Sequence, residues 1–146
     1  MHARLSTVTD GQVLAAGEFS RHLPIVMTPA IFGCSGLELT ADPELVDQVL
    51  INLLVNATHA LEARADARIE LSARLDGRGH VLIEVADNGP GIVEEAMEKI
   101  FIPFFTTKQD GSGIGLSLSR QIMRLHRGNI SVRSEPGEAT VFTLKF

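Results

Sequence analysis

The chain has 146 residues, of which 45% are hydrophobic and 21% are charged, and its formal net charge is −5. This balance is typical of one globular domain that is long enough to bury a full core. An acidic chain without a cluster of Lys or Arg gives no electrostatic reason to expect a nucleic acid as partner. Cys34 is the only cysteine, which excludes an internal disulfide framework and is typical of a reducing compartment.

The sequence shows no targeting or membrane signal. No apolar stretch reaches the roughly 18 residues that a membrane-spanning helix needs. Residues 1–20 lack a basic start followed by an apolar block, so we expect no signal peptide. We therefore predict a cytoplasmic domain that makes no direct contact with a membrane, whether or not its parent protein is membrane-anchored.

The first firm element is a long helix from Pro43 to about Ala63. Asp42 is a good N-cap, and proline is well suited to the first helical position. Residues 1–35 show no clean periodicity and stay unassigned, either as a linker or as the edge of a domain that we predict over residues 36–146.

The rest of the chain alternates between hairpin and helix patterns. Apolar and polar residues alternate on both sides of the turn at Asp76–Gly79, and the C-terminal residues do so around Pro136–Gly137. Helices and antiparallel hairpins in this order predict an α+β fold of two layers, with helices on one face of a sheet. The further elements expected are edge strands within 23–29 and 36–41, hairpin strands at 67–75 and 79–87, a short helix at 93–100, an irregular connection at 101–112, a helix at about 113–126 and a hairpin at 129–146.

The first helix carries a polar stripe inside an apolar sequence. Asn52, Asn56 and His59 are spaced four and three residues apart, so they stack on one side of the helix. Ile51 and Val55 lie beyond this stripe, which places the two amides between apolar side chains. Such amides either bond to neighbouring backbone or bind a ligand, and two in register with a histidine favour the ligand. The expected apolar face comprises Val46, Val49, Leu50, Leu53, Leu54, Ala57, Ala60 and Leu61.

An amide oxygen is a hard, neutral ligand, which suits a Mg²⁺ ion that draws most of its charge balance from phosphates. Asp87, Gly89 and Gly91 follow a predicted strand directly. A carboxylate there can accept a hydrogen bond from an exocyclic amine such as that of adenine, although the same residues also suit a plain turn.

Three further glycines, Gly111, Gly113 and Gly115, lead into the second long helix. Consecutive backbone N–H groups before a helix form a seat for an anion, although a glycine loop can also be a mere connection. The chain contains neither a Walker GxxxxGK[ST] pattern nor a strand–GxGxxG–helix unit. A phosphate seat here therefore belongs to another nucleotide-binding fold.

Four motifs in order give a family resemblance: the asparagine helix, DNGPG (87–91), IFIPFFTTK (100–108) and GSGIGLSLSRQIMRLHRGNISV (111–132). Over roughly Leu39 to Phe146 the chain resembles the catalytic ATP-binding domain of two-component sensor histidine kinases. These kinases share a superfamily with gyrase, heat-shock chaperone and mismatch-repair ATPases. The resemblance implies the Bergerat fold, a mixed and mostly antiparallel sheet with helices on one face, and it implies ATP and Mg²⁺ as ligands.

By the same resemblance, each motif residue receives an expected role. Asn56 would hold Mg²⁺ through its side-chain oxygen, with Asn52 supporting the metal and phosphate region. Asp87 would bind the adenine amino group. The other residues expected at the nucleotide are His59 near the phosphates, Gly89 and Gly91 at the pocket floor, Gly111, Gly113, Gly115 and Leu116 along the triphosphate, and Thr140 near the adenine.

Residues 92–112 would form the lid over the nucleotide. Lys108 in this segment is expected either to reach the γ-phosphate or to be an ordinary exposed lysine. Of Phe101, Phe104 and Phe105, we expect at least two to plug the base of the lid into the core. Ile102 stands where the family often has Glu, and Ala139 replaces a usual Gly before Thr140, but neither change removes a group that the chemistry needs.

Asn52 also bears on the reaction type. In the hydrolytic branches of the superfamily this position is a glutamate that activates water, whereas an amide cannot take a proton at neutral pH. We therefore expect a histidine kinase domain that gives the γ-phosphate to a histidine on a separate dimerisation domain of the same or a partner kinase, upstream of a response regulator. None of the chain's five histidines lies in a phosphoacceptor context. The alternatives are a non-catalytic nucleotide-binding module and, opposed by Asn52, a hydrolytic ATPase.

Overall fold

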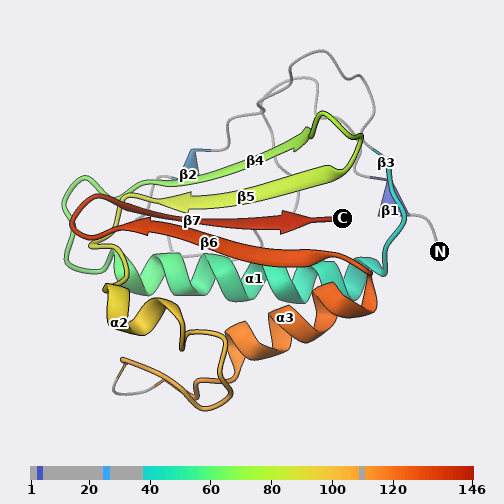
Figure 1. Cartoon of the computed structure of the whole chain (residues 1–146). Coiled ribbons are helices and arrows are strands. Elements are labelled where there is room, and N and C mark those ends of the chain that lie inside the picture. The colour runs from blue at the N-terminus through green and yellow to red at the C-terminus, as the bar shows by residue number, and fades with distance from the viewer. Residues whose placement is uncertain (1–2, 5–24, 27–37, 109–110) are drawn as a thin grey trace.

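The computed structural model describes residues 3–4, 25–26, 38–108 and 111–146 (Figure 1). Most of the N-terminal segment, with Cys34, lies outside these residues. The proposed division at residue 35 therefore stays a prediction. None of the helices in the described residues is long and apolar enough to cross a membrane.

The main sheet has five strands in the order β2-β4-β5-β7-β6. Every pairing is antiparallel except that of β2 with β4, which is parallel. A separate antiparallel pair joins β1 to β3. This confirms the mixed, mostly antiparallel sheet. The strands are β1 (Ala3–Arg4), β2 (Ile25–Val26), β3 (Glu38–Leu39), β4 (Ile69–Leu75), β5 (Val81–Asp87), β6 (Asn129–Glu135) and β7 (Ala139–Lys145).

The helices α1 (Pro43–Ala60), α2 (Glu94–Met97) and α3 (Gly115–Leu125) lie on one face of this sheet (Figure 1). The Asp42 side chain caps α1 as expected, because its Oδ1 accepts hydrogen bonds from the N–H groups of Glu44 and Leu45. All three helices are shorter than expected. The second long helix begins at Gly115 rather than near Gly113, since Gly113 takes a φ of +67°, which a right-handed helix excludes.

The core fills the space between the sheet and the helices. The expected apolar face of α1 is confirmed, with Val49, Leu53 and Leu61 each 1% exposed. Ile51 and Val55 lie outside this core, and Ile51 is 49% exposed. From the sheet and α3, the most deeply buried partners are Ile69, Val85, Leu144 and Met123. The polar stripe of α1 therefore separates a core-facing surface from a second apolar surface.

Candidate functional site

The loop that precedes α3 brings a cation onto the polar stripe of α1. The ammonium of Lys108 donates to Asn56 Oδ1 at 3.0 Å and lies 3.3 Å from Nδ1 of His59. Burial lowers the pKa of Lys108 below its ordinary value, although the charge of Glu62 partly offsets this effect. The Asn56 oxygen is thus turned toward a cation, as a metal ligand would be.

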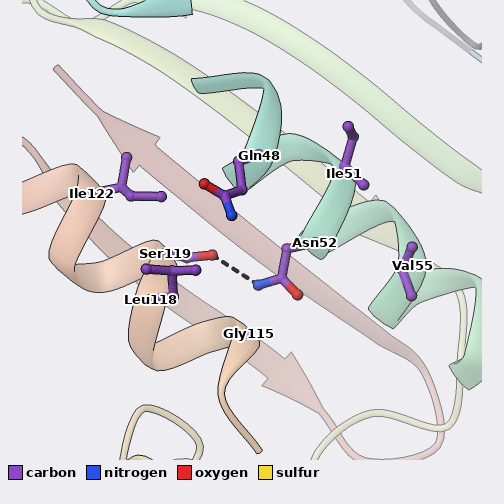
Figure 2. A pocket seen from close by; sticks show the side chains of 8 residues that line it. All are labelled: Gln48, Ile51, Asn52, Val55, Gly115, Leu118, Ser119 and Ile122. Atoms are coloured by element: carbon purple, nitrogen blue, oxygen red, sulfur yellow. Dashed lines mark hydrogen bonds between the residues drawn. The ribbon is translucent and has the colours of Figure 1, made fainter. Parts of the chain in front are cut away.

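The other amide of the stripe is held by α3. Asn52 Nδ2 donates to Ser119 Oγ at 2.9 Å (Figure 2). A Cβ placed on Gly115 would lie 2.2 Å from Asn52 Oδ1, so the amide oxygen rests against the first residue of α3. Only glycine leaves room for the side chain of Asn52 to approach the start of this helix so closely.

A groove of about 240 Å³ runs along α1 and α3 beside this amide. Figure 2 shows its apolar walls, formed by Ile51 and Val55 from α1 and by Leu118 and Ile122 from α3. Its polar lining comprises Gln48, Asn52 and Ser119, and Gly115 also lines it. The second apolar surface of α1 therefore faces a groove rather than the core.

A second polar group lies at the end of β5. Asp87 is only 7% exposed, and its Oδ1 accepts the N–H of Gly89 at 2.9 Å. Burial raises the pKa of the Asp87 carboxyl, and the Gly89 hydrogen bond opposes that shift less strongly. Among the described residues only the Gly89 N–H is bonded to this carboxylate, so its Oδ2 can accept a ligand donor.

Thr140 lies beside Asp87, because the two residues are register partners in the β5–β7 ladder. Thr140 in turn pairs with Ser134 of β6, whose Oγ lies 3.1 Å from Thr140 Oγ1. Ser134 Oγ also accepts the N–H of Ile92, the first residue of the predicted lid, at 2.8 Å. Sequence analysis missed Ser134, although counting back across the Pro136–Gly137 turn would have placed it opposite Thr140.

The polar groups follow one another along α1. A Cβ on Gly89 would lie 3.2 Å from that of Ala60, so the turn after Asp87 meets the C-terminal end of α1. Asn56 lies one turn earlier and Asn52 one turn earlier again. A helix rises 1.5 Å per residue, so the stretch from Ala60 to Asn52 covers about 12 Å. This spacing suits an elongated ligand with a different group at each end.

The remaining predicted residues lie around these groups. Gly91 follows the Asp87 turn, where a Cβ would lie 2.5 Å from the Glu135 carbonyl oxygen. Gly111 lies against Thr106 and Lys108. Gly113 accepts the N–H of Phe104 at 2.9 Å, and Leu116 packs against the core.

The phenylalanine motif differs from expectation, since only Phe101 of the three rings joins the core. The guanidinium of Arg120 stacks over this ring at 4.5 Å, which ties α3 to the motif. Phe105 is half-buried, and Phe104 is 76% exposed. Phe104 turns outward because its backbone takes a φ of +66° at the bridge to Gly113.

A metal could be held here only with help from a ligand. Within the described residues, no group of three or more His, Cys, Asp or Glu side chains could hold an ion. A cation on Asn56 would therefore take its remaining ligands from water and from an anionic ligand such as phosphate, which is how Mg²⁺ is usually bound in nucleotide sites.

Comparison with known proteins gives the class. The family described as histidine kinase-, DNA gyrase B- and HSP90-like ATPase matches residues 41–146, so the chain belongs to that family. The chain is 47% identical over 106 residues to the signal transduction histidine-protein kinase AtoS of Escherichia coli, covering 73% of this chain. It is 42% identical over 106 residues to the sensor histidine kinase ZraS of Salmonella typhimurium, again over 73% of this chain.

Solved structures agree with this class. The catalytic domain of the histidine kinase ThkA superposes with a TM-score of 0.65 at 37% identity, covering 78% of this chain and 73% of that one. Full-length ShkA in complex with AMPPNP gives a TM-score of 0.61 at 31% identity, covering 69% of this chain and 21% of that one. The resemblance to the catalytic domain of histidine kinases, and with it the Bergerat fold, is thereby confirmed. The chain spans only 17% of AtoS and 22% of ZraS.

Proposed function

We propose that this domain binds Mg-ATP and presents its γ-phosphate to a histidine on a separate dimerisation domain. The observation that supports this most is the order of groups along α1. A buried carboxylate lies at one end, the Asn56 amide lies one turn away, and the glycine start of α3 meets Asn52 at the other. Adenine at Asp87 and phosphates at Gly115 would match this order.

The adenine base of ATP is proposed to bind at Asp87. The other oxygen of Asp87, Oδ2, would accept the exocyclic amino group, with Thr140 beside it in the register. A guanine carries a carbonyl oxygen at the corresponding position, which a carboxylate would repel. Gly89 and Gly91 would form the floor, where the backbone lies so close to Ala60 and to Glu135 that a side chain would not fit.

The phosphates of ATP are proposed to bind to Asn56, Lys108 and the backbone N–H groups of the loop from Gly111 to Gly115. When bound, Mg²⁺ would neutralise charge on the phosphates. Asn56 would supply the one protein ligand to the metal through the oxygen that Lys108 contacts in the structure. His59 would lie near the phosphates, and Leu116 would fix the start of α3 against the core.

Transfer to an imidazole is favoured over hydrolysis because the site lacks a base for water at the position four residues before Asn56. Asn52 stands there, and its amide cannot accept a proton at neutral pH. The groove along α1 and α3 is lined by Asn52 and Gly115, which lie beside the proposed phosphate seat. We propose that the histidine-bearing helix lies in this groove with an apolar face against Ile51 and Leu118, as helices do in other grooves.

The test is to mix the chain with Mg-ATP labelled in the γ-phosphate and a histidine-bearing dimerisation domain from a related kinase. We expect acid-labile label on the dimerisation domain, and none when its histidine is replaced or when Asn56→Ala is used. Nucleotide binding without any transfer would favour a non-catalytic module. Steady phosphate release from this chain alone would favour an ATPase.

A further inference from the structure

Two buried serines of α3 differ in what their hydroxyl groups contact. Ser117 Oγ donates to the Ile114 carbonyl of its own helix at 2.8 Å. Ser119, which is 1% exposed, instead accepts the side-chain N–H of Asn52 from α1 at 2.9 Å. Ser119 therefore contacts a residue of the site, whereas Ser117 is satisfied within α3.

In the structure, the Asn52 amide faces Ser119 with its nitrogen, and the bond to Ser119 Oγ stabilises this orientation. An amide has donors on its nitrogen and acceptors on its oxygen, so a commitment of Nδ2 to Ser119 turns Oδ1 away from it (Figure 2). That oxygen lies against Gly115, at the start of α3. Without the hydroxyl at 119, this orientation of the amide would lose the hydrogen bond that holds it.

The orientation of the Asn52 amide matters because its nitrogen and its oxygen suit different neighbours. A nitrogen facing the seat would donate to a phosphate oxygen, whereas an oxygen facing it would repel phosphate and attract a donor. Asn56 lies four residues further along the same helix face, where Cβ atoms are about 5–6 Å apart. A metal held by Asn56 would carry water, and such a water is a donor that would suit Asn52 Oδ1.

We propose that Ser119 is a positioning residue that fixes Asn52 with its oxygen toward the metal's water. This inference rests on the proposed function, since it requires Mg-ATP at the site. It assigns the hydroxyl of Ser119 a role in metal-dependent binding rather than only in packing between helices.

The test compares four variants of the full chain, namely Ser119→Ala, Ser119→Thr, Asn52→Ala and the double Asn52→Ala/Ser119→Ala, by nucleotide titration with and without Mg²⁺. Loss of one hydrogen bond predicts that Ser119→Ala weakens Mg-ATP binding about fivefold. Binding of metal-free ATP should not change, and Ser119→Thr should restore the affinity because it keeps the hydroxyl. The double variant should bind as Asn52→Ala does, because Ser119 acts through Asn52.

Ser117→Ala is the matched control and should leave both affinities unchanged. Equal weakening by Ser119→Ala with and without metal, or a further loss in the Asn52→Ala background, would overturn the inference. If the unaltered chain fails to bind Mg-ATP, the proposed function fails instead, and the two failures are thereby distinct.

A measurement on the unaltered protein does not depend on whether the variants fold. In the isotope-labelled chain, the side-chain NH₂ protons of Asn52 should give nuclear Overhauser contacts to the β protons of Ser119. Contacts to the α protons of Gly115 instead would show the amide reversed and would also overturn the inference.

Discussion

The ammonium of Lys108 donates a hydrogen bond to the side-chain oxygen of Asn56, at 3.0 Å. Metal and ammonium would compete for that oxygen, because two cations at one amide oxygen repel each other. Binding of Mg-ATP should therefore displace Lys108, which is then free to meet the γ-phosphate. The contact would couple the loop before α3 to metal binding at Asn56.

Lys108→Met tests this coupling. Removing the competing cation should tighten Mg-ADP binding about threefold, an effect the size of one weak hydrogen bond. The affinity for Mg-ATP should rise by less, or fall, because the γ-phosphate loses a positively charged partner. Calorimetric titration with both nucleotides measures the difference, with Lys99→Met as the control because Lys99 is an exposed lysine of the preceding segment. Equal weakening of both nucleotides would contradict the competition.

Asp87→Asn should separate stability from nucleotide recognition. Burial raises the pKa of Asp87, so its charged form is disfavoured in the folded state. Its contribution to stability is fully present below the unfolded pKa and is lost as the pH rises through the folded pKa. At pH 7 the neutral amide should therefore raise the Tm, and this gain should fade as the pH falls toward 4.

The same Asp87→Asn variant should lose its preference for ATP over GTP. Asp66→Asn is the control, because the hydrogen bond from Arg64 lowers the pKa of that exposed carboxyl and should give the opposite sign. Thermal unfolding across pH and competition between ATP and GTP provide the two measurements. A variant with lower Tm at pH 7 and unchanged ATP preference would refute both roles of Asp87.

Gly113→Ala should destabilise the bridge between the phenylalanine motif and α3. Gly113 has a φ of +67°, and an added Cβ would lie 2.5 Å from the carbonyl carbon of Phe104. Such a backbone conflict costs on the order of 1–3 kcal/mol, which chemical denaturation can measure. Gly77→Ala is the control, because a Cβ there meets no atom within 4 Å. Equal stability of the two variants would show that the backbone at Gly113 accommodates a Cβ without cost.

His126→Phe should loosen the end of α3 from the start of α1. His126 Nδ1 lies 2.8 Å from the Ile122 carbonyl, and its Nε2 accepts the N–H of Asp42, the α1 N-cap, at 3.0 Å. Losing this tie should cost about 1 kcal/mol, the usual worth of one hydrogen bond. Thermal unfolding measures the loss against Leu125→Ala, since Leu125 is 74% exposed. An unchanged Tm would mean that water replaces the hydrogen bond between Asp42 and His126 without a loss of stability.

Much of the fold was predictable because its signals are local. The Asp42 cap, the apolar face of α1 and the two hairpin turns each depend on residues close in sequence, and all are confirmed. The exposure of Phe104 was not predictable, since it depends on a positive φ set by the bridge to Gly113, nine residues away.

The sequence indicated which residues belong to the candidate site better than it indicated which residues they contact. Spacing placed Asn52, Asn56 and His59 on one stripe, but spacing within α1 says nothing of what approaches that stripe. The Lys108 contact with Asn56 joins residues 52 apart, and the Ser119 contact with Asn52 joins residues 67 apart. Such pairs follow only from the packing of the loop and α3 on α1.

Titration of the chain and of Asn56→Ala with ATP, each with and without Mg²⁺, tests most directly whether a metal–triphosphate rests between α1 and α3. The unaltered chain should bind ATP more tightly with Mg²⁺ than without it. Asn56→Ala should lose that gain, by about tenfold or 1.4 kcal/mol, while its metal-free affinity stays the same. Equal losses with and without Mg²⁺, or no binding by the unaltered chain, would contradict the proposed site.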